Sequence, residues 1–165
     1  MNILVCVSVV PDTTTKITFK DNNQAFNDEG VQFIINPYDE LALTKALDIT
    51  DANGGEVTVV HVGSAKNDPS VRKTLAIGAH KAVRIDKEPE DAQDVANSIA
   101  EYAREKNFDM ILTGRESIDY NSGQVSGFLA ELLNLPSINV ITELELDGNT
   151  ASLVRDIDGG REMIS

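Results

Sequence analysis

The sequence predicts an α/β protein with a doubly wound, mostly parallel sheet and a small antiparallel excursion. Short runs rich in β-branched residues alternate with segments whose apolar residues recur at helical spacing. The first run, residues 3–9, is apolar nearly throughout, which is typical of a central strand covered on both faces. The spacing between runs suits right-handed βαβ crossovers. We therefore expect a single nucleotide-binding α/β domain over residues 1–165.

The strands of this sheet are expected at residues 3–9, 57–62, 82–85 and 109–112, with a fifth parallel strand at 138–141. Between the first strand and the first helix, turn-forming clusters at 21–23 and 27–30 separate short extended pieces, which predicts a small hairpin excursion. From Glu143 onward, apolar and polar residues alternate around a turn at 147–149, which predicts an antiparallel hairpin. The last residues resemble a strand that stops without a partner, so a C-terminally truncated chain is expected.

Four helix starts are predicted from capping signals. Asn36-Pro37 and Asp68-Pro69 each place a capping residue before a proline, and Asp91 precedes a strongly amphipathic segment. The fourth helix follows residues 113–124, where Asn121 or Ser122 is expected to act as the cap. Glycines at 54–55 and 78 mark the ends of the first two helices.

The composition excludes several classes of function. Lysine and arginine total 14 against 27 aspartates and glutamates, a formal net charge of −13, which disfavours nucleic-acid binding and attachment to anionic membranes. The one cysteine, Cys6, lies in an apolar run and is expected to be a buried thiol in a reducing compartment. No leader or membrane-spanning segment is evident, so a cytoplasmic location is expected.

No catalytic or metal-binding motif is evident in the sequence. His61 lies within a predicted strand and His80 in a loop, and both are expected to be structural. Zinc spacing, a nucleophile elbow, a P-loop and the dinucleotide fingerprint are absent. The run at 156–160 is expected to be a tight turn and not a calcium loop. We expect a nucleotide to be bound here and not hydrolysed.

The loop at residues 113–124 is the predicted nucleotide site. It lies between a strand and a helix, where unpaired N–H groups at the helix N-terminus favour a phosphate. The end of the first strand and the Asn36-Pro37 helix start should lie at the same sheet edge. Gly123 would admit an anion without an obstructing Cβ.

Several segments together resemble the β subunit of electron transfer flavoprotein, most closely its bacterial members. They are ILVCV at 3–7, VPDTT at 10–14, INPYDE at 35–40, LAIGA at 75–79, GRESID at 114–119, SGQ at 122–124 and RDIDGG at 155–160. The resemblance covers the whole chain and implies a Rossmann-like fold of the adenine nucleotide alpha hydrolase type.

This resemblance implies a non-catalytic subunit of an electron carrier. It would form a heterodimer with an α subunit that holds most of a redox-active FAD, while this subunit binds structural AMP. The carrier would take electrons from dehydrogenases, such as the acyl-CoA dehydrogenases of fatty acid oxidation, and pass them to a membrane quinone oxidoreductase. Full-length family members would continue past Ser165.

By position, the resemblance places the AMP site on residues from three parts of the chain. Asp119 is expected to shape the loop or pair with Arg115, because a carboxylate would repel phosphate. The cofactor-binding set is Cys6, Asn36, Pro37, Tyr38, Asp39, Val62, Gly114, Arg115, Ser117, Asp119, Asn121, Ser122, Gly123 and Gln124.

Two alternatives remain open from the sequence. Electron-bifurcating members of the family bind a second FAD at the AMP position, and residues 122–127 partly match their loop whereas Tyr120 and Asn121 do not. A stand-alone adenine-nucleotide-binding protein resembling universal stress proteins is the other, and it would form a homodimer without flavin.

Overall fold

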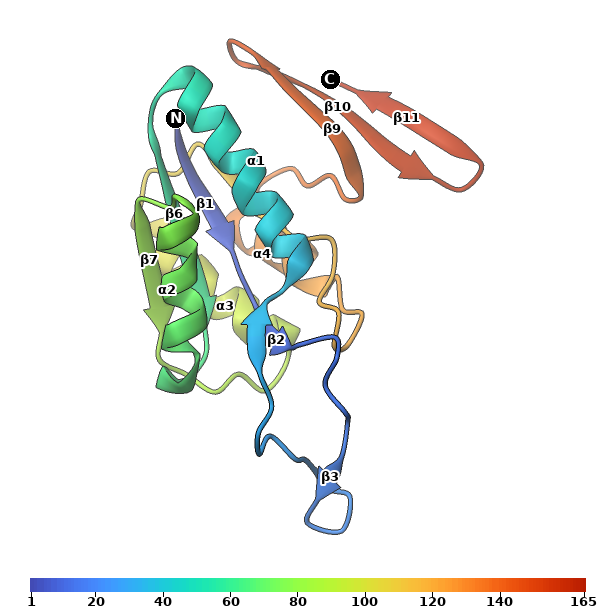
Figure 1. Ribbon diagram of the computed structural model, residues 1–165. Helices are drawn as coiled ribbons and strands as arrows, with labels where there is room; N and C mark the ends of the chain where they lie inside the picture. Colours follow the sequence, from blue (N-terminus) through green and yellow to red (C-terminus); the bar gives the residue numbers. More distant parts are fainter.

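The computed structural model describes residues 1–165 and is organised around a four-stranded parallel sheet (Figure 1). The strand order is β7-β6-β1-β8, and every neighbouring pair is parallel. These strands are β1 (Asn2–Cys6), β6 (Glu56–Val62), β7 (Lys81–Ile85) and β8 (Met110–Thr113). Strands β1 and β6 are buried on both faces, as their continuous apolar runs predicted.

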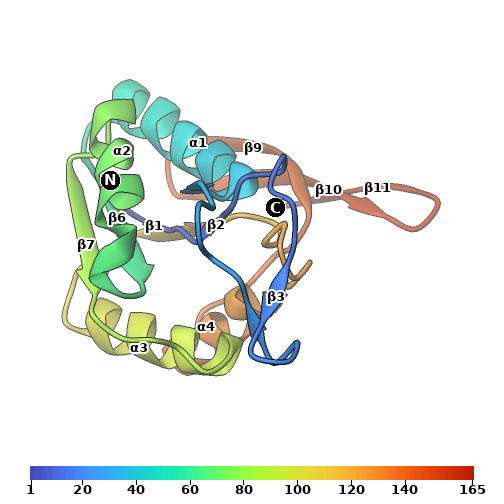
Figure 2. The ribbon, with the colours of Figure 1, turned by 60° about the horizontal axis from the view of Figure 1, so that its bottom comes forward.

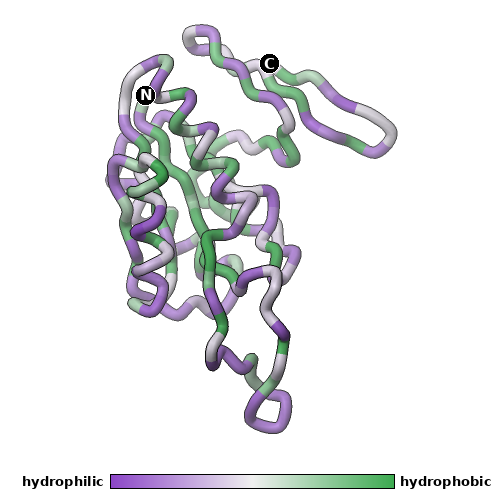
Figure 3. The backbone as a smooth tube through the Cα atoms, viewed as in Figure 1, coloured by the Kyte–Doolittle hydropathy of each residue, from purple (hydrophilic) through white to green (hydrophobic).

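Helices cover both faces of this sheet (Figure 2). On one face lie α1 (Pro37–Asn53) and α2 (Asp68–Ile77), and on the other α3 (Ala92–Arg104) and α4 (Gln124–Leu133). Alternate residues of β1 divide between the two layers. Ile3 and Val5 pack in a cluster with α1, whereas Leu4 and Cys6 pack in a second cluster with α3 and α4. Figure 3 shows the resulting hydrophobic strand at the centre of the chain.

The direction of winding reverses at β1. From β1 the chain moves outward through β6 to β7, and it then returns through α3 to place β8 on the other side of β1. The carboxyl ends of β1 and β8 therefore flank the switch point, where open α/β sheets form their ligand crevices. The predicted doubly wound α/β fold is confirmed.

The predicted first strand at 3–9 is divided in two. Strand β1 ends at Cys6, and β2 (Val9–Pro11) belongs to a separate antiparallel pair with β5 (Phe33–Ile35). The predicted hairpin excursion is confirmed, because β3 (Phe19–Lys20) pairs with β4 (Ala25–Phe26) beyond this pair. Residues 21–23 all adopt positive φ at its tip, which short polar side chains tolerate.

The predicted fifth parallel strand at 138–141 is wrong. Residues 135–140 form a connection, and Val140 has a φ of 58° that interrupts extended structure. Ile141 instead begins an antiparallel sheet of β9 (Ile141–Asp147), β10 (Thr150–Ile157) and β11 (Gly160–Ile164). The predicted hairpin and its turn at 147–149 are present there. The last strand pairs with β10, which corrects the expectation of an unpaired strand.

The helices start close to the predicted positions, but the predicted capping contacts are not all present. Asn36 is the N-cap residue of α1 and Pro37 its first residue, but the Asn36 side chain makes no capping bond. At α2, Asp68 lies within the helix and Asn67 is the N-cap, after a short 3₁₀ turn (Ala65–Asn67). Asp91 caps α3 as predicted, by accepting a hydrogen bond from the Asp94 N–H. None of the helices is both long and apolar enough to cross a bilayer.

Candidate functional site

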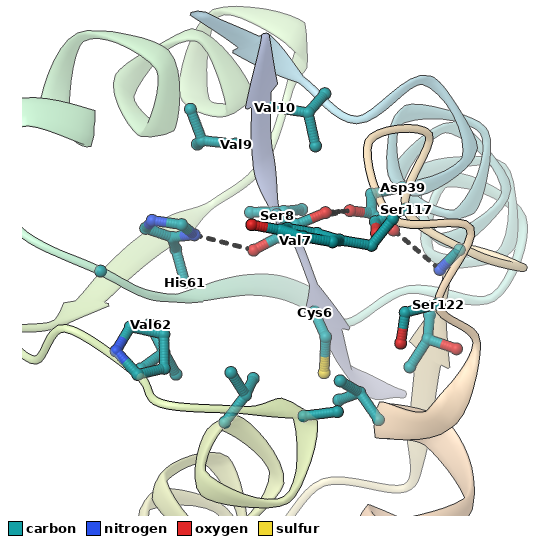
Figure 4. A pocket seen from close by; sticks show the side chains of 18 of the residues that line it. Cys6, Val7, Ser8, Val9, Val10, Asp39, His61, Val62, Ser117 and Ser122 are labelled. Carbon is teal, nitrogen blue, oxygen red and sulfur yellow. Dashed lines mark hydrogen bonds between the residues drawn. The ribbon is translucent and has the colours of Figure 1, made fainter. Parts of the chain in front are cut away.

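A cavity of about 690 Å³ opens at the carboxyl ends of the parallel strands (Figure 4). Its walls come from the chain after β1, the end of β6, the segment leading into α3, and the loop from β8 to α4. The volume falls in the range typical of small-molecule sites. The cavity therefore lies at the switch point that the sequence predicted.

The N-terminus of α4 faces this cavity without a cap. Gly123 occupies the N-cap position and has no side chain to bond the first turn. The backbone N–H groups of Gln124, Val125 and Ser126 have no hydrogen-bond acceptor in the protein, and all three residues line the cavity. Unpaired N–H groups at a helix start form a binding site for anions.

The expected capping role of Asn121 or Ser122 is wrong. Asn121 adopts a φ of 51° and lies two residues before the N-cap position, so its side chain cannot serve the first turn. The Ser122 carbonyl accepts a hydrogen bond from the Ser117 N–H at 3.0 Å, which closes the loop on itself. The loop geometry thus leaves the helix end open.

The N-terminus of α3 borders the same cavity but is occupied by protein groups. Asp91 Oδ1 accepts a hydrogen bond from the Asp94 N–H at 2.8 Å. Asp94 pairs with Lys87, and the hydrogen bond from that lysine holds the pKa of Asp94 below its ordinary value. An anion would meet two carboxylates at this helix start, so α4 is the end available to it.

The start of α1 ties two walls of the cavity together through side chains. The Asn36 side chain donates to the Glu116 carbonyl at 2.9 Å and accepts from the Ile118 N–H at 3.3 Å. One turn on, the Asp39 carboxylate accepts hydrogen bonds from Ser8 and from the Gly114 N–H. Asn36 is 1% exposed and Asp39 is 6% exposed. The predicted convergence of these three segments is confirmed.

Burial governs the ionisation of the two titratable groups at the floor of the cavity. Burial raises the pKa of Asp39, and the hydrogen bonds from Ser8 and Gly114 oppose that rise. Burial, reinforced by the nearby Asp39 charge, raises the pKa of the Cys6 thiol to about 12. Cys6 is therefore a neutral, apolar lining group at physiological pH, as the sequence predicted.

The end of β6 supplies the opposite wall. His61 Nδ1 lies 2.9 Å from the Val7 carbonyl, and Asn67 Nδ2 lies 2.9 Å from His61 Nε2. Both ring nitrogens are thus engaged by structural contacts, and burial lowers the pKa of His61. His80 Nδ1 accepts from the Val57 N–H. These contacts support the structural roles expected for both histidines.

Among the residues that line the cavity, several carry carboxylates and none is a lysine or an arginine. The acidic residues are Asp39, Glu88, Glu90, Asp91, Glu116 and Asp119. Peptide dipoles at α4 are consequently the main positive feature offered to an anion. Carboxylates can accept hydrogen bonds from sugar hydroxyls, as they do in dinucleotide-binding folds.

The predicted site residues separate into two groups. Nine line the cavity: Cys6, Asp39, Val62, Gly114, Ser117, Asp119, Ser122, Gly123 and Gln124. Asn36, Pro37, Tyr38, Arg115 and Asn121 do not. Of the two roles expected for Asp119, the structure shows the first, because its carboxylate accepts a hydrogen bond from the Tyr120 N–H within the loop. The alternative pairing with Arg115 is wrong, since Arg115 lies near Glu116.

The sequence did not indicate two further parts of the site. Ser8 lies in the break between β1 and β2 and donates two hydrogen bonds to Asp39. Its position as a polar residue within an apolar run is the one signal that could have marked it. Residues 88–91, which precede α3, form another part of the wall. The capping signal at Asp91 predicted the start of the helix but not this wall.

Fold and site together define a doubly wound α/β protein with a cavity at its switch point and an uncapped helix N-terminus facing that cavity. Comparison with known families then gives a match to the electron transfer flavoprotein domain over residues 24–164. The chain belongs to the electron transfer flavoprotein family.

Curated relatives extend this similarity to nearly the whole chain. It is 38% identical to the electron transfer flavoprotein subunit beta of Bacillus subtilis and, also at 38%, to that of Syntrophomonas wolfei, over 99% of this chain in each case. It is 32% identical to Protein FixA of Sinorhizobium fredii, over 99% of this chain and 61% of that protein. The chain spans 65% of the length of the first two relatives.

Proposed function

We propose that this chain binds AMP in the cavity and is the nucleotide-binding part of an electron transfer flavoprotein β subunit. The uncapped N-terminus of α4, open to the cavity, is the observation that carries the proposal. The phosphate takes the place of the missing cap, because it accepts hydrogen bonds from N–H groups that the protein leaves unpaired.

The rest of the cavity suits the remainder of the nucleotide. Cys6, Val62 and Val95 supply an apolar surface for the adenine ring. Ser117 and Ser122 offer hydroxyl groups beside the α4 start, and Gly123 leaves the approach to its amides open. Of the predicted residues outside the cavity lining, Asn36 supports the walls through its hydrogen bonds to Glu116 and Ile118.

In the whole protein, this domain supports a partner subunit that holds the flavin. The proposed partner is an α subunit that binds most of the FAD, and FAD supplies the electron-accepting chemistry when it is bound. The complex then acts in the cytoplasm as a carrier from dehydrogenases, including acyl-CoA dehydrogenases, to a membrane quinone oxidoreductase. On this proposal the 1–165 domain contributes structure and nucleotide binding, with no catalytic residue of its own.

The test begins with the nucleotide that the native protein carries. The protein is purified with its partner, denatured, and the released nucleotides are separated and identified. We expect AMP in a 1:1 ratio to this chain, alongside the FAD of the complex. Two FAD molecules per complex and no AMP would instead assign the cavity to a second flavin. A colourless homodimer that retains ATP would contradict the electron-carrier proposal.

Calorimetry then tests where the phosphate lies. The nucleotide-free chain is titrated with AMP and with adenosine, which differ only in the phosphate. We expect AMP to bind more tightly, by roughly 10- to 100-fold, because hydrogen bonds to a charged group contribute about 1.5–3 kcal/mol. Equal affinities would show that the α4 amides do not hold the phosphate.

A further inference from the structure

Asp39 is the point at which three segments of the cavity wall meet (Figure 4). Its Oδ2 atom accepts hydrogen bonds from both the N–H and the hydroxyl of Ser8, each at 2.7 Å. Its Oδ1 atom accepts from the Gly114 N–H at 3.1 Å. Ser8 follows β1 and Gly114 follows β8, so one carboxylate on α1 holds the ends of both strands that flank the switch point.

The hydrogen-bonding capacity of this carboxylate is largely used within the protein. Three donors already approach its two oxygens, and the residue is 6% exposed. A carboxylate offers about four acceptor positions in all. We propose that Asp39 is a positioning residue, which shapes the nucleotide cavity by fixing the Ser8 and Gly114 backbone and does not contact the nucleotide itself. The identity of the ligand in this statement rests on the proposed function.

The packing at Gly114 independently shows how close these segments lie. A Cβ atom at Gly114 would lie 2.1 Å from Asp39 Oδ1 and 2.8 Å from the Asp39 backbone nitrogen. No side chain fits in that space, so only glycine lets the β8 end reach the carboxylate. The glycine and the carboxylate thus form one complementary contact in the cavity wall.

Removing the negative charge should loosen the wall and leave most of the fold in place. In Asp39→Asn, the amide group has one acceptor oxygen, and its N–H₂ group would face a backbone N–H donor. At least one of the Ser8 and Gly114 N–H groups would then lose its acceptor. Because these residues line the cavity, the loss should move the surface that the nucleotide contacts.

The experiment compares Asp39→Asn with Glu40→Gln in the full chain. Glu40 is exposed and lies on the same first turn of α1, so its variant removes an equal charge without touching the cavity. AMP affinity is measured by calorimetry, and the Ser8 and Gly114 amide protons are followed by NMR. We expect Asp39→Asn to weaken AMP binding about tenfold or more, and at least one of these amide signals to move upfield and exchange faster. Glu40→Gln should change neither.

Ser8→Ala is the milder second variant and removes one of the three bonds. It should weaken AMP binding less than Asp39→Asn does, and it serves if the latter variant does not fold. Unchanged affinity in an Asp39 variant whose amide signals have moved would overturn the proposal. Weakened affinity with unmoved Ser8 and Gly114 signals would overturn it too, because Asp39 would then contact the nucleotide directly. If the unmodified chain binds no AMP, the proposed function fails, while the amide signals still test the contact.

Discussion

Helices α3 and α4 lie side by side and both begin at the cavity, yet their N-termini are built differently (Figure 2). The start of α3 is closed by the Asp91 carboxylate and flanked by Asp94. The start of α4 has glycine at the N-cap position and no side-chain acceptor. The difference shows that the protein itself supplies an acceptor at the start of α3, whereas the N–H groups at the start of α4 are left available to a ligand.

Closing the α4 end should have the largest effect. In Gly123→Asp, a carboxylate would occupy the N-cap position and compete with the phosphate for the same N–H groups. The backbone φ of −113° at Gly123 is accessible to ordinary residues. We expect calorimetry to show a loss of AMP affinity of roughly 100-fold.

The matched control is Gly123→Ala. Its Cβ would also lie 2.9 Å from the Arg115 carbonyl oxygen, so it reproduces the steric cost without the charge. A smaller loss of affinity in this variant than in Gly123→Asp would assign the difference to capping and repulsion. Equal losses would remove the electrostatic argument for α4.

Removing the cap at the N-terminus of α3 should have a moderate effect, and the quantity affected is the stability of the fold. Asp91→Ala removes the side chain that accepts the Asp94 N–H. Substitution of such a cap by alanine lowers the free energy of unfolding by about 1 kcal/mol. Urea denaturation checks this value, with Asp91→Ser as the variant that retains a capping oxygen. A midpoint that is unchanged in Asp91→Ala would mean that the α3 cap contributes nothing to stability.

The pH dependence of Asp94 should give the smallest effect. Its pKa is held below the ordinary value of 3.8 by the hydrogen bond from Lys87. The stabilisation is therefore fully present above pH 3.8, and it is lost as the pH falls through the lower pKa of the folded state. Urea midpoints should fall less steeply in Asp94→Asn than in the unmodified chain on acidification below that range. Parallel curves for the two proteins would exclude a contribution from Asp94.

The sequence predicted the parallel sheet well because its strands are defined by local patterns. The apolar runs around Ile3 and Val57 have hydrophobic side chains on both faces of the strand, so both faces must be buried. The run at 138–141 has a similar composition, but a short apolar run does not specify its partner strand. In the structure, Val140 turns the chain toward β10, whose Asp156 N–H donates to its carbonyl.

The location of the cavity was predictable from the sequence, whereas the contacts of the individual side chains around it were not. Asn36 and Pro37 correctly marked the start of α1. The local pattern could not show that the Asn36 side chain bonds Glu116 and Ile118, because these partners are distant in sequence. The same reason explains Ser8, whose importance depends on Asp39. Capping rules also failed at Asn121, where the positive φ belongs to the loop conformation.

The contacts made by Asp39 also bear on the order in which the chain folds. Its bond to Gly114 joins residues 75 positions apart, whereas its bonds to Ser8 join residues 31 apart. Contacts between distant residues carry a larger loop-closure cost and form slowly. The cavity wall is therefore complete only once Gly114, which follows β8, has reached Asp39. A ligand that needs this wall would recognise only chains that have finished that step.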